Sequence, residues 1–354
     1  MPPFTQNPNP GNQGTIEALL TFPEVSNLVK KKFLDLLPNQ EIDAKPLFIF
    51  DSVPSGQGAS VQKNEIDFTT YARNKPEGSN TQKGSMGIGF HNAVGLYRYG
   101  LEFDITWEMR TTQQWVNVVN LTAEALAMAV PQRINLDMTH MLTFGNAVSY
   151  VDMDGVVRNT STGDGLPLFD AAHLLAFSAT TYSNIVPGNP LFTKTALEAA
   201  ELLAKYNIFD NFGVMKQMSF KTIWCADTPN LTNDIMQLIR STTDPIQANP
   251  GVVNPYKTKY DILPLSKLAT DANGAPDPTK YQWWGIAALA GSGGSRWQAY
   301  HIQWEAPMMK PMPTGSFSTT NAEDVHNDNW TYGSRGASNF MAVVAKGIVA
   351  SMAV

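Results

Sequence analysis

The sequence predicts an α+β protein built around one long helix. Residues 111–142 carry apolar side chains at three- and four-residue steps, which is the rhythm of a helix with one apolar stripe. The stretch before it, 51–95, is polar, rich in glycine and poor in aliphatic residues. From about residue 186 onward, helical and strand patterns alternate, which is typical of a sheet flanked by helices.

The amino-acid composition excludes some classes of function. The chain has 354 residues, of which 43% are hydrophobic and only 16% are charged, so its core is sizeable and its surface is unusually poor in charge. Such a surface suits a protein that covers much of itself with copies of itself. The net charge of −6 argues against a dedicated nucleic-acid binder, because neutralising phosphates needs a basic excess. The single cysteine, Cys225, excludes an internal disulfide and is expected to be buried and inert.

The first 44 residues are predicted to form an arm. Residues 1–14 are rich in proline, asparagine and glycine, and they lack the basic and apolar regions of a signal peptide. Residues 15–37 then show a helical apolar rhythm that is interrupted near Pro23. A short apolar strand follows at 45–50.

The polar stretch 51–95 cannot bury enough apolar surface to fold on itself. We therefore expect it to have no partner in its own chain and to lie across another subunit. The flanking strands, 45–50 and 96–109, bracket it as an extended β-hairpin. The charged residues in the stretch are candidates for contacts between subunits: Lys63, Glu65, Asp67, Arg73, Lys75, Glu77 and Lys83.

The long helix 111–142 contains Pro131, which should bend it. After it, residues 148–157 are predicted to form a hairpin, because Asp154-Gly155 tolerates the positive φ of a tight turn.

The second half contains two predicted helices with start signals. Thr195 and Glu198 fit a capping box that opens a helix to Tyr206, and Thr228 precedes Pro229 at the start of a helix to Arg240. Strands are expected at 219–226, 260–265, 283–290, 297–307 and 340–350.

No catalytic, cofactor or metal site is predicted. The five histidines have no metal-ligand spacing, and the pairs Asp170/His173 and His326/Asp328 are interpreted as capping or turn hydrogen bonds. The glycine runs at 87–89 and 291–295 lack the Gly-Lys-Ser/Thr ending of a phosphate loop. A cluster of aromatic residues is interpreted as core packing or subunit interface in preference to a stacking platform for bases or sugars: Tyr281, Trp283, Trp284, Trp297, Tyr300 and Trp304.

Four segments in this order, 165–173, 195–206, 222–229 and 254–264, resemble the major capsid proteins of tailed bacteriophages, especially the Mu-type major head subunit. The resemblance covers about residues 15–350 and implies the HK97-type fold. It implies an N-terminal arm (1–44) and an extended loop with its flanking strands (45–110). It further implies a peripheral domain with the spine helix (111–185, completed by about 300–335) and an axial domain (186–299, completed by about 336–354).

The resemblance also implies a structural function without enzyme activity. Hexamers and pentamers of the chain would close into an icosahedral shell around double-stranded DNA, as part of a virion assembled in the host cytoplasm and without a membrane. A separate scaffolding protein is expected because the chain starts directly with the arm; a portal, cement proteins and non-specific DNA contact are further partners. Some members of the family crosslink through a loop lysine and an asparagine, but no motif selects Lys63, Lys75 or Lys83, so no crosslink is assigned.

Two alternatives remain open. The first is an encapsulin-like nanocompartment shell, which shares the fold and encloses enzyme cargo. The second is a soluble α/β hydrolase with a long lid, although the sequence contains no Gly-x-Ser-x-Gly elbow.

Overall fold

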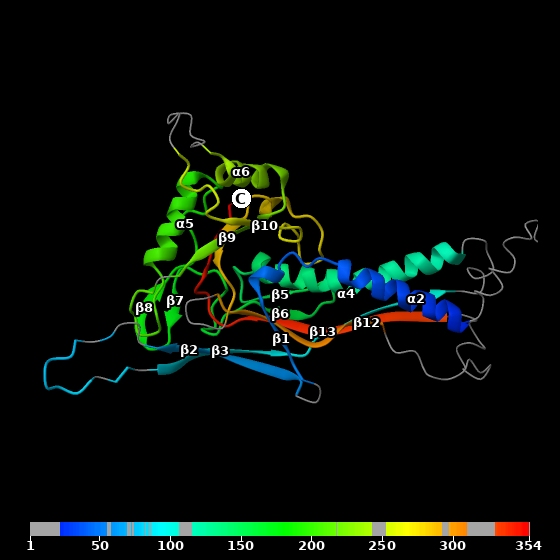
Figure 1. Ribbon diagram of the computed structural model, residues 1–354, viewed down its shortest axis with the longest axis horizontal. Helices are drawn as coiled ribbons and strands as arrows, with labels where there is room; N and C mark the ends of the chain where they lie inside the picture. The colour runs from blue at the N-terminus through cyan, green and yellow to red at the C-terminus, as the bar shows by residue number, and fades with distance from the viewer. Residues whose placement is uncertain are drawn as a thin grey trace, which may run out of the picture. The chain divides into compact units, whose positions relative to one another are not determined.

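The computed structural model describes residues 22–54, 58–68, 72, 74–81, 83–84, 86–105, 115–216, 218–242, 253–291, 297–309 and 330–353 (Figure 1). It divides into two compact units. The first comprises Met1–Ile42, Tyr97–Ile134 and Glu305–Ala337, and the second comprises Asp43–Leu96, Asn135–Trp304 and Ser338–Val354. The fold is α+β, as predicted.

The first unit is built on two helices and a strand pair. Helix α2 (Phe22–Leu36) continues into the 3-10 turn η1 (Leu37–Asn39), and the first part of α4 (Trp115–Thr143) belongs to the same unit. Strand β4 (Arg98–Ile105) pairs antiparallel with β13 (Trp330–Ala342). The apolar stripe of α4 meets α2 and β13 in one buried cluster: Val29, Phe33, Val119, Ala123, Leu126, Ala127 and Tyr332.

The long helix predicted for 111–142 is confirmed from Trp115 onward as α4, which continues through Pro131, while residues 111–114 lie outside the described residues. The prediction succeeds because an apolar pattern with a helical period over this length is too long for a strand.

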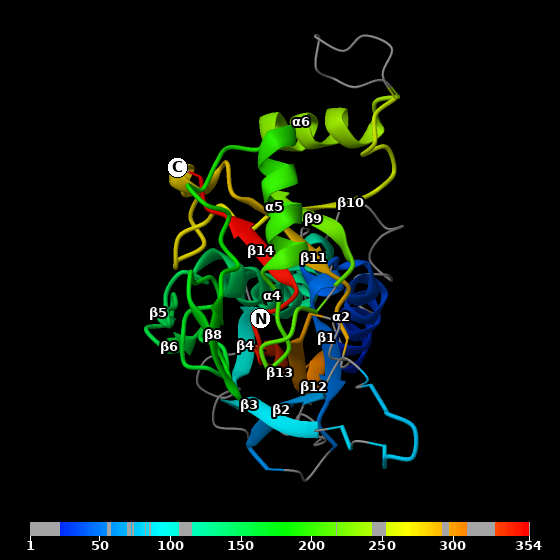
Figure 2. The same ribbon diagram turned by 90° about the vertical axis from the view of Figure 1, so that its left-hand side faces the viewer.

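The second unit contains a mixed sheet with two helices against it. Strand β9 (Phe220–Ala226) pairs parallel with β10 (Asp261–Leu265) and antiparallel with β11 (Trp284–Ala288), which in turn pairs with β14 (Ile348–Ser351). Helix α5 (Lys194–Tyr206) contacts β14, and α6 (Pro229–Arg240) contacts β9 and β10 (Figure 2). The short 3-10 turn η3 (Pro278–Lys280) precedes β11.

The helix starts differ in detail from the prediction. Thr193, not Thr195, is the N-cap of α5, and its Oγ1 accepts a hydrogen bond from the Ala196 amide. Thr228 stands at the N-cap of α6, but its hydroxyl donates to the Tyr281 carbonyl instead of capping the helix. Both helices begin within two residues of the predicted position.

The hairpin lies inside the polar stretch and not between its flanks. Strand β2 (Ser60–Phe68) pairs antiparallel with β3 (Met86–Gly95). The described parts of the flanking segments do not pair with each other. Strand β1 (Ile49–Ser52), which follows the 3-10 turn η2 (Lys45–Leu47), pairs with β12 (Ala299–Met309), and β4 pairs with β13. In Figures 1 and 2 the described part of the connection, 74–81, extends away from β2 and β3.

Two smaller hairpins complete the second unit. Strands β5 (Ser149–Val151) and β6 (Val157–Asn159) confirm the predicted hairpin, with Gly155 at a φ of 75°. Strands β7 (His173–Leu175) and β8 (Ser178–Tyr182) form the other.

One five-residue turn recurs three times in this unit, beginning at Asp152, Asp210 and Asp271. In each, the Asp Oδ1 accepts from the amides two and four residues later, and a glycine at the fourth position has a φ between 75° and 82°. Only glycine adopts this φ without strain. The pattern Asp-x-x-Gly is visible in the sequence at all three positions, although a tight turn was predicted only at Gly155.

Candidate functional site: the two faces of the β2–β3 hairpin

The β2–β3 hairpin has one charged face turned into the protein and one apolar face turned outward. Successive side chains of a strand point to opposite faces, so Glu65 and Asp67 share one face and Ile66 lies on the other. Glu65 and Asp67 are 3% and 1% exposed, whereas Ile66 is 56% exposed. This inverts the usual distribution, because a charged pair is buried and an apolar side chain faces water.

The buried face is held by two lysines from distant parts of the chain. Lys216 Nζ lies 2.9 Å from Asp67 Oδ1, and the Asn211 amide donates to Asp67 Oδ2 at 3.0 Å. Lys346 Nζ lies 2.8 Å from Glu65 Oε1 and 3.9 Å from Asp67 Oδ2. Two negative and two positive groups therefore neutralise one another inside the protein.

Burial alone would raise the pKa of Asp67. The hydrogen bonds from Lys216 and the Asn211 amide, together with the charges of both lysines, outweigh burial and hold the pKa of Asp67 below its usual value. Asp67 is therefore ionised in the folded protein at neutral pH.

The base of the hairpin is fixed as well. Asn92 Nδ2 donates to the carbonyls of Ser161 and Ala342 at 2.9 and 2.8 Å. Val94 is buried with neighbours from β12, the end of β13 and the segment after it, and Val61 packs against them: Tyr300, Ile302, Met341, Val343 and Val344. The expectation that the stretch 51–95 has no partner in its own chain is therefore wrong for the inward face of β2 and β3.

Gly89 lets β3 pass close to the charged cluster. A Cβ on Gly89 would stand 2.5 Å from Asn211 Nδ2 and 2.6 Å from Glu65 Oε2. We expect Gly89→Ala to lower the free energy of unfolding by about 1–3 kcal/mol, because overpacking a filled site displaces its neighbours. Gly95→Ala, whose new methyl would meet its nearest atom at an ordinary 3.8 Å, is the matched control in a urea titration. Equal stability of the two variants would contradict this description of the site.

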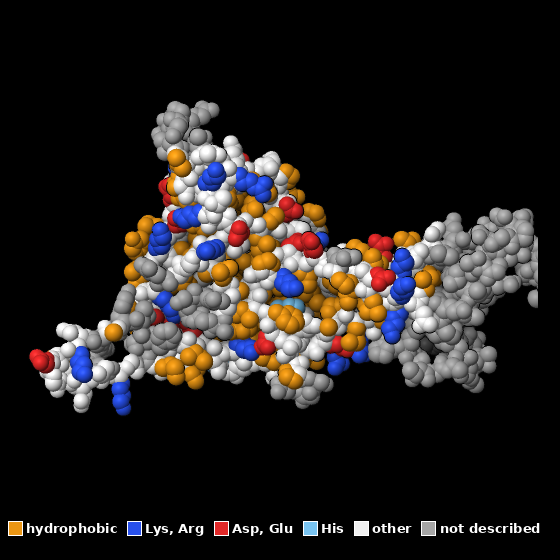
Figure 3. Space-filling model, in the orientation of Figure 1, with side chains coloured by type: hydrophobic (Ala, Val, Ile, Leu, Met, Phe, Trp, Pro, Cys, Tyr) orange, Lys and Arg blue, Asp and Glu red, His pale blue; other side chains and the backbone are white. Residues whose placement is uncertain are grey.

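The outward face presents three large apolar side chains that neighbour one another across the strands. Ile66 pairs in register with Ile88, and Met86 stands at the start of β3 opposite Phe68. Met86 and Ile88 are 77% and 66% exposed. Figure 3 shows hydrophobic side chains gathered over β2 and β3, beside a mainly polar projection formed by their connection. We call Ile66, Met86 and Ile88 the outer apolar face.

The structure divides the seven predicted contact residues into groups. Glu65 and Asp67 are committed to ion pairs within their own chain, contrary to the expectation that they pair with a neighbouring subunit. Lys63 pairs with Asp51 and lies 5.5 Å from the centre of the Tyr300 ring. Lys75, Glu77 and Lys83 are exposed on the connection between β2 and β3, and Arg73 lies outside the described residues. For these four residues, contact with a neighbouring subunit stays a prediction.

A second exposed apolar group lies on the β5–β6 hairpin, for which the sequence predicted a hairpin but no exposed surface. Its five members are each at least 40% exposed: Val148, Val151, Met153, Val156 and Val157. Val151 and Val157 face each other in register. The hydrophobic pattern alone could not separate this surface from a core strand.

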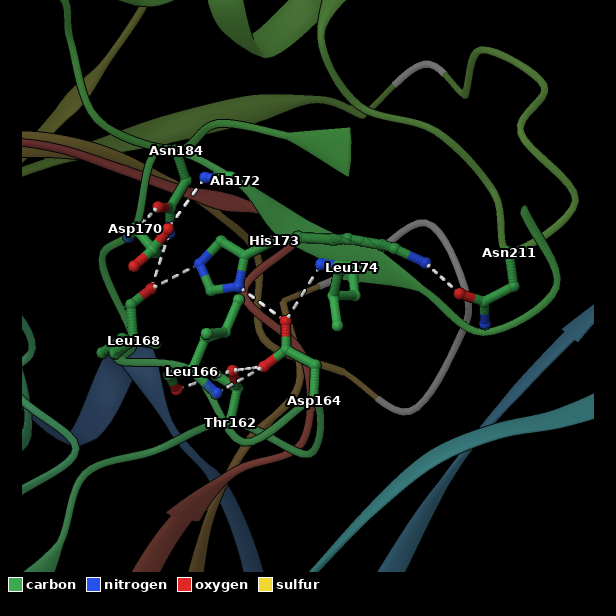
Figure 4. A network of polar contacts seen from close by, with 11 residues as sticks. Thr162, Asp164, Leu166, Leu168, Asp170, Ala172, His173, Leu174, Asn184 and Asn211 are labelled. Atoms are coloured by element: carbon green, nitrogen blue, oxygen red, sulfur yellow. Dashed lines mark hydrogen bonds and ion pairs between the residues drawn. The ribbon is translucent and has the colours of Figure 1, made fainter. Parts of the chain in front are cut away.

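His173 is structural, but its partner differs from the expected one. His173 Nδ1 lies 2.9 Å from Asp164 Oδ2, and Nε2 lies 3.3 Å from the Leu168 carbonyl (Figure 4). Asp170 instead accepts from the Ala172 amide. Asp164 also accepts from Thr162 and Leu166, so the network closes a turn rather than opening to a substrate. The pair His326/Asp328 lies outside the described residues.

Acid should destabilise the protein through the carboxylate of Asp164. Burial would raise the pKa of Asp164, but the hydrogen bonds from His173 and Thr162 lower it overall. A depressed folded pKa gives stability that is present above the unfolded value and lost as the pH falls through the folded pKa. We expect the free energy of unfolding to fall below about pH 4, and to fall less steeply in Asp164→Asn. An identical acid dependence in the variant, measured by urea unfolding, would contradict this role.

The cysteine and most of the aromatic cluster lie in the core. Trp284 and Trp297 are fully buried and Trp283 nearly so, while Tyr281 is 38% exposed. Trp284 Nε1 donates to the Pro190 carbonyl. Burial raises the pKa of Cys225 to about 12, so its thiol stays protonated and unreactive.

No group of three or more His, Cys, Asp or Glu side chains in the described ranges could hold a metal ion. None of the described helices has the length and apolar character needed to cross a membrane.

Comparisons with known proteins give similarity in structure alone. No family model and no curated protein sequence matches the chain. Among solved structures, 162 chains match. The mature capsid of bacteriophage PhiM1 is 10% identical, with 87% of this chain and 85% of that chain covered and a TM-score of 0.47.

A structure from Mycobacterium phage Patience is 10% identical, with 92% and 87% covered and a TM-score of 0.47. The virus-like particle from Pyrococcus furiosus is 9% identical, with 92% and 97% covered and a TM-score of 0.42. All of these TM-scores lie below 0.5.

Proposed function

We propose that this chain is the major subunit of a capsid, a structural protein that assembles with copies of itself into a closed shell. The observation that carries the proposal is the outer apolar face of the β2–β3 hairpin. Its three side chains are exposed on a hairpin whose opposite face is fixed by buried ion pairs. A hairpin held in this way is preorganised to bind, because little conformational entropy is lost when a partner covers it.

The free energy gained by burying the outer apolar face is large enough to hold a protein partner. Complete burial of one large aliphatic side chain contributes about 1.5–3 kcal/mol, so covering Ile66, Met86 and Ile88 offers several kcal/mol per contact. A contact of this strength, repeated around a ring and between rings, stabilises a large assembly without any single tight interface.

The partner is a second copy of the chain. Only 16% of the residues are charged, which leaves much of the surface suited to self-association. The chain also carries a second, separate apolar surface on β5–β6. Two different surfaces permit heterologous contacts, which close into rings when the rotation allows.

The rings are hexamers and pentamers that form an icosahedral shell around double-stranded DNA in a virion. Assembly takes place in the host cytoplasm with a scaffolding protein and a portal. The net charge of −6 supports weak, non-specific contact with the packaged DNA rather than a dedicated binding site.

Electron microscopy tests the proposal. The chain is purified alone and after co-expression with the scaffolding protein encoded beside it, and closed shells are expected in at least one preparation. Nuclease-protected DNA in particles from the natural source supports the phage shell, whereas enclosed enzyme without DNA supports a nanocompartment. Small monodisperse particles under both conditions would overturn the proposal.

A further inference from the structure

His301 is a buried histidine that takes part in none of the sites described above. It lies near the start of β12 and is 7% exposed. Its Nε2 is buried and has no hydrogen-bond partner among the described residues. Burying an imidazole nitrogen without a partner is costly, and burying it with a charge costs far more, so the fold favours the neutral ring.

Aromatic rings surround the imidazole on its face of the sheet. Phe50 of β1 pairs in register with His301, and their ring centres are 5.5 Å apart. Phe340 of β13 lies on the other side, with its ring centre 4.9 Å from that of His301. Phe48 meets Phe340 edge to face at 6.0 Å. These side chains carry no oxygen that could accept a hydrogen bond from a charged imidazole.

The charges near His301 oppose its protonation. Burial, and then the positive charge of Lys45 on η2, lower the pKa of His301 from an ordinary 6.5 to about 4. On β1, the carboxylate of Asp51 alternates to the opposite face and pairs with Lys63. The residues that flank His301 and Phe340 on the same face of β12 and β13 are uncharged: Ala299, Gln303, Ser338 and Ala342.

Of β1, β12 and β13, β1 is the strand that can yield. It has four residues and lies at the edge of the sheet of described strands, whereas β12 is held between β1 and β13. Phe50 is itself 54% exposed, so displacing β1 brings water to His301. A short edge strand with few buried contacts opens locally at a lower free energy than the rest of the fold.

We propose that His301 is a pH-sensitive latch at the root of the β2–β3 hairpin. Protonation of its imidazole loosens β1 from β12 and frees the strand that leads into the hairpin. The hairpin itself stays in place, because the ion pairs of Glu65 and Asp67 do not involve β1 or β12. Mild acid therefore releases the root before it releases the hairpin.

The pH window of the latch follows from linkage. The pKa of His301 in the closed state is about 4, below the ordinary 6.5, so the open state binds more protons between these two pH values. The stability of the closed latch is fully present above pH 6.5 and is lost as the pH falls toward 4. The open fraction should therefore increase at least about tenfold between pH 7 and pH 5.

Hydrogen exchange of the free subunit, followed by mass spectrometry, tests the proposal. Protection factors are measured at pH 7 and pH 5 for peptides that cover β1 and the Val53 amide, which donates to the Gln303 carbonyl at 2.8 Å. Strand β9, in a different sheet, is the internal reference. We expect β1 to lose at least about tenfold in protection, and β9 to change little. Equal protection of β1 at both pH values would overturn the proposal.

Variants assign the effect to His301. His301→Leu should abolish the pH-dependent loss of protection, whereas His91→Gln, which replaces an exposed histidine on β3, should retain it. Lys45→Glu alters an exposed side chain, so it leaves the core intact, and it should reduce the loss because a negative charge favours the closed state of the protonated ring.

A loss of full size in His301→Leu, or in Lys45→Glu at low ionic strength, would contradict the latch. These measurements do not depend on shell formation. The latch and the proposed function can therefore fail separately.

Discussion

Ile66→Asp is expected to abolish assembly of the chain into shells while leaving the subunit folded. Ile66 is more than half exposed at the centre of the outer apolar face, next to Ile88. An aspartate there costs little in the free subunit, because the side chain faces water. In the assembly it would be buried against apolar side chains of a second copy without a partner, which costs several kcal/mol at every contact.

The matched control is Gln62→Asp, which adds the same charge to the same face of β2, away from the three apolar side chains. Sedimentation and electron microscopy should find shells with the control and only subunits or small rings with Ile66→Asp. Circular dichroism should find both variants folded. Shells of normal size and yield from Ile66→Asp would show that the outer apolar face is not an interface.

Lys216→Met is expected to lower the free energy of unfolding by about 3–5 kcal/mol, because removing one member of a buried ion pair is strongly destabilising. The side chain of Lys216 is 7% exposed and that of Asp67 is 1% exposed. Methionine keeps most of the volume of lysine, so the loss measures charge more than packing. Lys346, whose Nζ lies 3.9 Å from Asp67 Oδ2, is unchanged by the substitution.

Lys259→Met provides the comparison for this second variant. The side chain of Lys259 is 41% exposed in its pair with Glu201, and an exposed pair contributes about 0–1 kcal/mol. Urea unfolding at neutral pH measures both. If the two substitutions cost the same, the charged cluster under the hairpin does not hold it in place.

Long, strongly periodic segments could be predicted from the sequence, and segments whose partners are distant could not. Helix α4 was predicted because its apolar stripe runs for eight turns, and α6 because Pro229 marks its first residue. The hairpin was placed wrongly because glycines and charges hide the alternation of β2 and β3. A local window cannot show that a charged strand is neutralised elsewhere.

Glu65 is a site residue whose partner is distant in the sequence and could not be predicted from it. In the sequence it belongs to a mixture of charges typical of a solvated loop, and its partner Lys346 is 281 positions away. The available signal was the alternation Glu65, Ile66, Asp67 with Lys346 in an apolar C-terminal segment, where a lone lysine needs a buried counter-charge. The outer apolar face follows from the same alternation once the inward face is known.

A map of the assembled particle at side-chain resolution tests the central claim most directly. It should show a neighbouring copy covering Ile66, Met86 and Ile88, while Glu65 and Asp67 keep their lysines within the same chain. A shell in which these three apolar side chains face solvent would contradict the account.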